Sequence, residues 1–99
     1  MRLRYTPRAL TELDEVLTYI AERSPQGARR VQVRVQAVTA LLTEYPRSGQ
    51  PTTNPRLRCM VAAPYPYLIF YEATEAEIII VGVRHAARDP GSMPSKESP

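Results

Sequence analysis

The sequence predicts an α+β fold of the order β-α-α-β-β-β, in which a helical hairpin packs on a small, mainly antiparallel sheet. Two amphipathic helical stripes, which begin near Pro7 and Pro25, come first along the chain. Three β-rich segments follow them. A short alternating segment, Arg2–Tyr5, precedes the first helix and predicts a strand with one buried face.

Both helices carry the same start signal. Thr6 and Ser24 each provide an N-cap hydroxyl, and each is followed by a proline at the first helical position, where the missing N–H costs nothing. Apolar residues then recur at spacings of three and four, to Ala21 in the first helix and to Tyr45 in the second. The short connection predicts an antiparallel hairpin, with Val33 off its main apolar stripe.

Residues 47–55 are polar and proline-rich, so no regular structure is expected there. The predicted strands after them are Arg56–Val61, Tyr67–Glu72 and Glu77–Arg84. In the first of these, alternation places Leu57, Cys59 and Val61 on one face and Arg58 on the other; in the second, it places Tyr67 and Tyr71 together, against the helices. The run 78–83 is apolar on both faces, which is typical of a central strand.

The chain is expected to be one domain, residues 1–90, followed by a disordered tail, residues 91–99, that is rich in proline, glycine and serine. No apolar run is long enough to span a bilayer, and no secretory signal is present, so we expect a cytosolic protein with no membrane partner. Cys59 is the single cysteine, which excludes an intrachain disulfide and predicts a small residue of the core.

The 99 residues carry a net charge of +3, and the basic residues are unevenly placed. Residues 24–71 carry six arginines against Glu44 alone, a net charge of +5, whereas residues 1–23 are balanced. The planar guanidinium suits phosphate and carboxylate, so this distribution favours an acidic partner. A solvated surface in an arginine-rich protein explains the same composition equally well.

Candidate functional residues gather at the end of the last predicted strand, in Arg84, His85 and Arg88. His85 is the only histidine, so any imidazole acid–base step would use it, with Arg84 favouring its neutral form. A packing role at the strand end is the alternative. The candidate anion or target-binding site consists of Arg56, Arg58, Arg84 and Arg88, provided that strand pairing brings Arg58 and Arg84 to one face. Ion pairs with Glu72, Glu75 or Glu77 account for these arginines as well.

The usual enzyme motifs are absent: no glycine-rich phosphate loop, nucleophile elbow or paired carboxylates accompany these residues. No metal site or cofactor is expected, because no second histidine and no cysteine cluster would complete one.

Six segments, in this order and spacing, resemble the RelE/ParE toxins of bacterial toxin–antitoxin systems. They are Tyr5–Leu13, Ile20–Arg23, Tyr45–Gly49, Leu57–Arg58, Tyr67–Tyr71 and Val83–Arg88. The resemblance extends over residues 1 to about 90 and implies a cognate antitoxin as partner, with an antitoxin segment wrapped over the helices and the sheet.

The resemblance implies two alternative activities. RelE-like members are ribosome-dependent mRNA endoribonucleases, for which Arg58 and Arg84 would neutralise phosphate and His85 would act as acid or base. ParE-like members poison DNA gyrase and generally lack the catalytic set. No tyrosine follows Tyr71 and the first helix is not lysine-rich, so the chain looks closer to ParE. We therefore expect a non-enzymatic gyrase inhibitor; the alternatives are an endoribonuclease acting on the ribosome and an inert relative that only binds its antitoxin.

Overall fold

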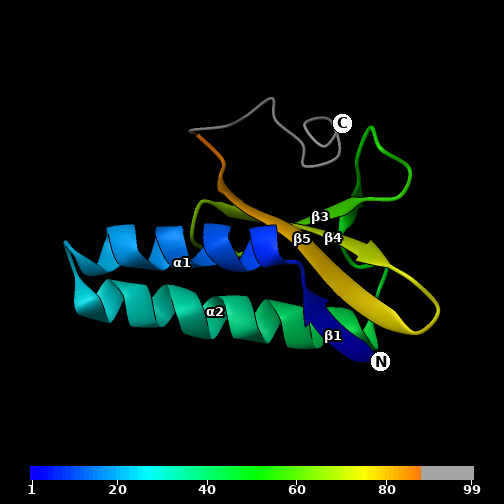
Figure 1. Cartoon of the computed structure of the whole chain (residues 1–99), viewed down its shortest axis with the longest axis horizontal. Coiled ribbons are helices and arrows are strands. Elements are labelled where there is room, and N and C mark those ends of the chain that lie inside the picture. Colours follow the sequence, from blue (N-terminus) through cyan, green and yellow to red (C-terminus); the bar gives the residue numbers. More distant parts are fainter. Residues whose placement is uncertain (88–99) are drawn as a thin grey trace.

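The computed structural model describes residues 1–87 as two helices packed on a five-stranded sheet (Figure 1). The elements, in chain order, are β1 (Arg2–Tyr5), α1 (Pro7–Ala21), α2 (Pro25–Glu44), β2 (Gln50–Pro51), β3 (Arg58–Val61), β4 (Tyr67–Ala73) and β5 (Glu77–His85). The predicted α+β class is confirmed, and one short strand, β2, is added to the predicted order. The segment 91–99, expected to be a disordered tail, and Arg88 lie outside the described residues.

The sheet has the strand order β1-β5-β4-β3-β2, so the first strand joins the last one. β1 runs parallel to β5, and the other neighbours are antiparallel, which makes the sheet mainly antiparallel as predicted. β5 therefore lies between two strands. Ile78, Ile79 and Ile80 are all buried, which confirms the prediction of a central strand covered on both faces.

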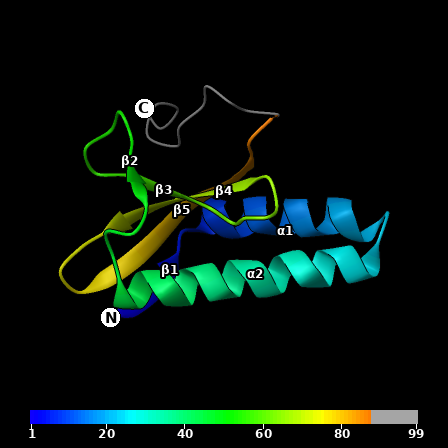
Figure 2. The same cartoon turned by 180° about the vertical axis from the view of Figure 1, so that it is seen from behind.

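Both helices begin where the sequence predicts. The Thr6 Oγ1 accepts a hydrogen bond from the Ala9 N–H at 3.1 Å, and the Ser24 Oγ accepts one from the Gly27 N–H at 3.0 Å. These bonds satisfy amide donors that the first turn of a helix leaves without an intrahelical acceptor. The two helices form the expected antiparallel hairpin, and their connecting turn extends beyond the sheet (Figures 1 and 2).

The hydrophobic core lies between the helices and one face of the sheet. α2 contributes Val31, Val35, Val38 and Leu42, whereas Ala9 is the only fully covered residue of α1. The apolar stripe of α1, which includes Leu13 and Leu17, packs against the core but stays partly exposed. β4 places Tyr67, Ile69 and Tyr71 in this core, so the predicted orientation of the two tyrosines is confirmed.

Three predictions around β3 are wrong in part. The segment 47–55 is not wholly irregular, because Gln50 and Pro51 pair with Cys59 and Arg58 to form the sheet edge. Proline is tolerated in an edge strand, because such a strand pairs with a neighbour on one side only and does not need every backbone N–H. β3 begins at Arg58 instead of Arg56.

Cys59 is not a residue of the helix-facing core. It pairs with Phe70 of β4, whereas Arg58 pairs with Tyr71 and Met60 with Ile69, so the helix-facing side of β3 carries Arg58 and Met60. The alternation of Arg58 and Cys59 was predicted correctly, but alternation alone does not say which face the helices cover. Partial burial raises the pKa of the Cys59 thiol.

The hydroxyl of Tyr71 ties the end of α2 to the sheet. Its Oη donates to the Pro46 carbonyl at 2.8 Å and accepts from the Gly49 N–H at 2.9 Å. Burial raises the pKa of this phenol, against the opposing effects of the Gly49 N–H and of Arg58. Gly49 has no room for a side chain, because a Cβ would lie 2.6 Å from this oxygen. The core and the loop after α2 are therefore one connected structure.

We predict that Tyr71→Phe lowers the free energy of unfolding by about 1–3 kcal/mol, because it leaves the Pro46 carbonyl and the Gly49 N–H without their partner. Urea denaturation followed by circular dichroism measures the change. Tyr45→Phe, which removes a hydroxyl from a largely exposed side chain, is the matched control and should change stability by less than about 0.5 kcal/mol. Equal stability of the two variants would contradict the role given to the Tyr71 hydroxyl.

Candidate functional site

The predicted anion-site residues Arg58 and Arg84 lie on opposite faces of the sheet. Arg58 is paired with Tyr71 and Arg84 with Leu68. Tyr71 and Leu68 are three positions apart on β4, and positions an odd number apart point to opposite faces. The proposed anion site depended on both arginines lying on one face, and the strand pairing does not meet that condition.

Arg58 is engaged with the backbone of the loop after α2. Its Nη1 donates to the Gly49 carbonyl at 2.7 Å and to the Arg47 carbonyl at 3.4 Å. Arg56 lies in the turn before β3, is exposed, and donates its backbone N–H to the Asn54 Oδ1 at 2.9 Å. Arg58 thus stabilises a loop, while Arg56 remains at the surface. Arg88 is not among the described residues.

Arg84 is one of the few buried charged residues, with only 7% of its surface exposed. Its Nη2 lies 3.6 Å from the Glu12 Oε2. The same carboxylate oxygen lies 3.3 Å from the Nε of Arg8, one helical turn earlier in α1. The other oxygen of Glu12 accepts the backbone N–H of Val83 at 2.9 Å. One carboxylate therefore joins α1 to the C-terminal half of β5.

The Glu12 cluster, comprising Arg8, Glu12, Val83 and Arg84, was not predicted from the sequence. The spacing of Arg8 and Glu12, four residues apart on a helix, is a local signal for an ion pair. Their contact with β5, 71 positions away in the chain, has no such local signal. Of the acidic residues proposed to pair with Arg58 or Arg84, Glu77 instead contacts Arg4 of β1 at 3.3 Å.

His85 faces Tyr67, which is its direct partner across the β4–β5 pair. The two rings pack edge to face with centroids 5.2 Å apart. The His85 Nδ1 accepts the backbone N–H of Ala87 at 3.0 Å. An Nδ1 that accepts an N–H is unprotonated, so the neutral ring carries its proton on Nε2 and directs its Nδ1 lone pair at the Ala87 N–H. Arg84 points to the opposite face of β5, so the two residues do not converge on one substrate atom.

The three candidate catalytic residues all contact groups of the protein itself. His85 and Arg58 bond backbone groups, and Arg84 contacts a carboxylate that also receives a backbone N–H. Within residues 1–87, no group of three or more acidic, histidine or cysteine side chains is placed to hold a metal ion. No helix in the same part of the chain is long and apolar enough to cross a membrane.

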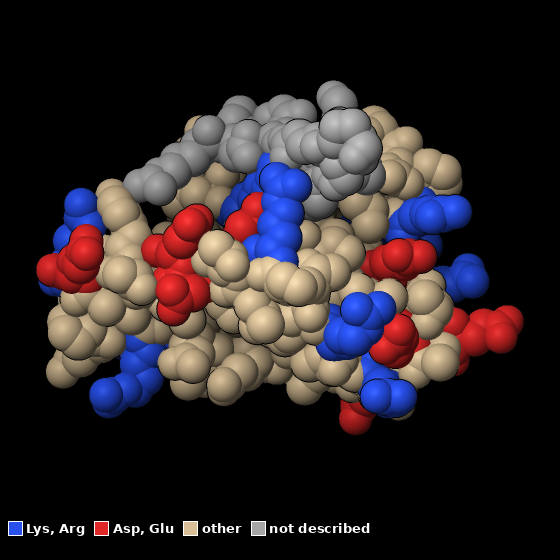
Figure 3. All heavy atoms as spheres, in the orientation of Figure 1, with Lys and Arg blue, Asp and Glu red and all other residues tan. Residues whose placement is uncertain are grey.

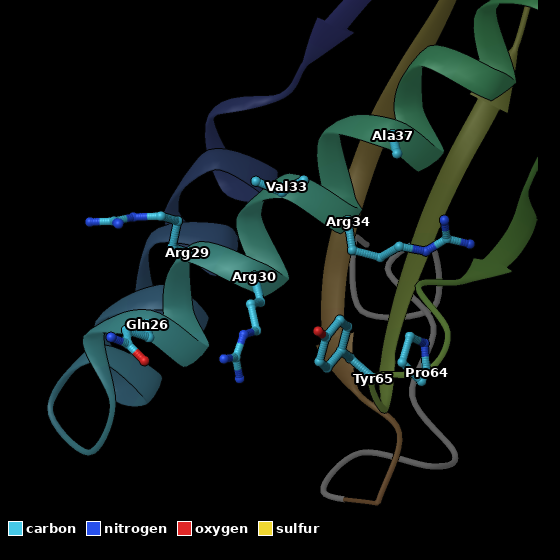
Figure 4. A pocket seen from close by; sticks show the side chains of 8 residues that line it. All are labelled: Gln26, Arg29, Arg30, Val33, Arg34, Ala37, Pro64 and Tyr65. Atoms are coloured by element: carbon cyan, nitrogen blue, oxygen red, sulfur yellow. The ribbon is translucent and has the colours of Figure 1, made fainter.

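An open groove lies between α2 and the turn that joins β3 to β4, with a volume of about 750 Å³. Val33 and Ala37 line it from the helix, and Pro64 and Tyr65 line it from the turn. Three arginines, Arg29, Arg30 and Arg34, also line this groove, together with Gln26. Arg30 and Arg34 extend on either side of the Tyr65 ring, whereas Arg29 points away from the turn (Figure 4).

The groove combines an apolar floor with positive charge, and none of its lining residues is acidic. Val33 keeps 58% of its surface exposed, in agreement with its predicted place off the apolar stripe. In contrast, acidic and basic side chains are interspersed over the face of the molecule that Figure 3 shows. We call this groove, whose lining includes Arg30, Val33, Arg34 and Tyr65, the α2 groove.

Comparison with known proteins assigns the chain to a class. Residues 3–90 match the model of a family described as the ParE toxin of the type II toxin–antitoxin system parDE. Toxin Y4kP of Sinorhizobium fredii is 40% identical over 85 residues, which span 86% of this chain and 88% of that protein. Toxin RelE2 of Caulobacter vibrioides is 39% identical over 84 residues, 85% of this chain and 93% of that protein.

A solved structure shares the fold. A chain of the chromosomal ParDE toxin–antitoxin system from P. aeruginosa superposes with a TM-score of 0.72 at 20% sequence identity, over 86% of this chain and 95% of that one. Family model, relatives and fold together define a toxin of a type II toxin–antitoxin system. Within that class, the chain belongs to the ParE toxin family.

We predict that Glu12→Ala lowers the free energy of unfolding by about 2–4 kcal/mol. The substitution removes the acceptor of the Val83 N–H, and it removes the carboxylate next to the buried Arg84 guanidinium. Because the Glu12 side chain is 18% exposed, the loss of stability is smaller than for a fully buried pair. Urea denaturation is the measurement. Glu15→Ala, an exposed acid on the same helix, is the control, and an equal effect of both variants would show that the Glu12 cluster contributes nothing.

Proposed function

We propose that this protein is a toxin that inhibits DNA gyrase by binding it, without catalysis, and that a cognate antitoxin neutralises it. The observation that carries the non-enzymatic part is the engagement of the three candidate catalytic residues. Arg58 bonds loop carbonyls, Arg84 contacts Glu12 of α1, and the His85 Nδ1 accepts a backbone N–H. A general base must present a free lone pair toward the proton that it removes.

Membership of the ParE family and the sequence features that resemble ParE support gyrase as the proposed target. The alternative activity is ribosome-dependent mRNA cleavage. It is kept because one relative bears the name RelE2. The fold does not separate the two activities, since the same architecture is implied for both. The placement of Arg58, Arg84 and His85 favours binding.

We predict that the purified protein inhibits negative supercoiling by purified DNA gyrase and that its induction in cells yields no codon-positioned cuts in mRNA. A supercoiling gel and primer-extension mapping of transcripts are the two measurements. Cuts that appear with the wild-type chain and vanish in His85→Ala would contradict the proposal and establish the endoribonuclease. Expression without growth arrest would instead indicate an inert relative.

The α2 groove is proposed as part of the antitoxin-binding surface. Its apolar floor suits aliphatic or aromatic side chains, and its arginines suit carboxylates, so the matching partner segment is both acidic and amphipathic. A phosphate backbone would leave the floor of Val33, Ala37 and Pro64 without an apolar partner. An antitoxin segment that folds on binding can cover such a surface together with the helices.

We predict that Arg30→Glu combined with Arg34→Glu weakens antitoxin binding by about tenfold or more, because both charges next to the Tyr65 ring are reversed. Isothermal titration with the purified product of the adjacent reading frame measures the affinity. The control is Arg2→Glu, which makes the same kind of charge reversal, at one site instead of two, at an exposed residue of β1 away from the α2 groove. An antitoxin affinity unchanged by the double variant would place the antitoxin elsewhere.

A further inference from the structure

We propose that residues 44–48, the last residue of α2 and the loop that follows it, are a preformed contact site for the protein target of the toxin, and that Tyr45 and Arg47 are its contact residues. This inference rests on the proposed function, a toxin that acts by binding a protein target. It adds the surface that makes the contact. The loop lies at the C-terminal end of α2 and lines a shallow depression of about 490 Å³.

The backbone of this loop is fixed by bonds to α2 and to the sheet. The Tyr45 N–H bonds the Leu41 carbonyl at 2.8 Å, and the Ser48 hydroxyl donates to the Tyr45 carbonyl at 2.7 Å. The fully buried Tyr71 holds the Pro46 carbonyl and the Gly49 N–H, as described above. Arg58 holds the Gly49 carbonyl from the same face of the sheet. Hydrogen bonds to α2, β3 and β4 therefore hold the backbone of this segment at Tyr45, Pro46, Ser48 and Gly49.

The side chains that this backbone carries point outward. Tyr45 keeps 60% of its surface exposed, more than any other large hydrophobic residue in the described part of the chain, and Arg47 is also exposed. Tyr19, another exposed tyrosine, has the Arg23 guanidinium 3.8 Å from its ring centre. Among residues 1–87, no comparable cation covers the ring of Tyr45. A largely exposed tyrosine ring is thus displayed on a loop that hydrogen bonds hold in place.

Rigidity and residue type together give the loop its function as a contact site. Tyrosine and arginine are the residues most enriched at positions that dominate the energy of protein interfaces. Ordering a loop on binding costs free energy, and here the hydrogen bonds to Tyr71 and Arg58 have ordered it beforehand. The core tyrosine therefore contributes to binding indirectly, as a positioning residue for Tyr45 and Arg47.

The charges of the loop fit a protein better than a nucleic acid. Glu44 lines the same depression as Tyr45, Pro46, Arg47 and Ser48, and its carboxylate would repel a phosphate backbone. A protein surface can offer a basic or neutral group near Glu44, a carboxylate to Arg47 and an apolar slot for the Tyr45 ring. The chemistry that matches the loop is thus an apolar protein pocket with an acidic residue at its rim.

The test compares Tyr45→Ala and Arg47→Ala with wild type in gyrase inhibition and growth arrest. Both variants should require about tenfold more toxin for half-maximal inhibition of purified gyrase, while their affinity for the antitoxin stays within about twofold. Tyr45→Phe should retain activity, because the ring makes the contact. Tyr19→Ala, which removes an exposed tyrosine at the far end of the hairpin, should also behave as wild type. Thermal unfolding confirms that each variant is folded.

The outcomes separate the inference from the proposed function. If wild type inhibits gyrase and both alanine variants inhibit it equally well, the loop is not the contact site, although the proposed function stands. If wild type fails to inhibit gyrase or arrest growth, the proposed function is wrong and the inference falls with it. Binding of a fluorescent 30-base-pair duplex that weakens in both variants would replace the protein partner by DNA and overturn the assignment of partner class.

Discussion

The difference in length between β5 and β1 is the constraint on which much of the structure depends. β1 pairs with β5 only as far as Ile80, and the Thr6 N–H then bonds the Ile80 carbonyl as the chain turns into α1. Beyond that point the edge of β5 has lost its neighbouring strand, and its Val83 N–H requires another acceptor. Glu12 provides it from the second turn of α1. The position of α1 on the sheet is thereby tied to the pairing of the strands.

The position of Glu12 at the edge of β5 determines the role of Arg84. A carboxylate placed at the sheet edge next to a largely buried guanidinium stabilises its charge, and Arg8 adds a second positive group to the same oxygen. A residue that the sequence indicates as a ligand for phosphate is thus part of the attachment of α1 to β5. In the same way Arg58 attaches the loop after α2 to β3. Arg84 therefore contributes to the attachment of α1 to the sheet, and Arg58 to the attachment of the loop after α2.

The elements that were predictable from the sequence are those specified by local patterns. Proline after an N-cap hydroxyl located the start of each helix, and the alternation in β4 placed Tyr67 and Tyr71 in the core. The relative phase of Arg58 and Arg84 was not predictable, because it depends on the register of three strands and on the irregularity in the β4–β5 pair at Phe70 and Tyr71. β2 is two residues long, too short for any pattern. The contact of Glu12 with Val83 spans 71 positions and has no local signal in the sequence.

Two open surfaces of the described residues, the α2 groove and residues 44–48, combine exposed apolar groups with arginine. The polar residues that resemble a catalytic set are directed toward the protein itself. This separation is the physical basis of the proposal that the toxin acts by binding. It also explains why the basic excess of residues 24–71 is relevant to partners, because the groove and loop arginines lie within that segment.

The imidazole of His85 offers the most direct measurement, since a nuclease would use it as acid or base. Nitrogen-15 NMR of the histidine side chain, at a pH where the ring is neutral, distinguishes the protonated ring nitrogen from the unprotonated one. The hydrogen bond from the Ala87 N–H predicts an unprotonated Nδ1 and a proton on Nε2. A neutral ring with its proton on Nδ1 would leave the Nε2 lone pair free to act as a base, and would contradict a toxin that acts by binding alone.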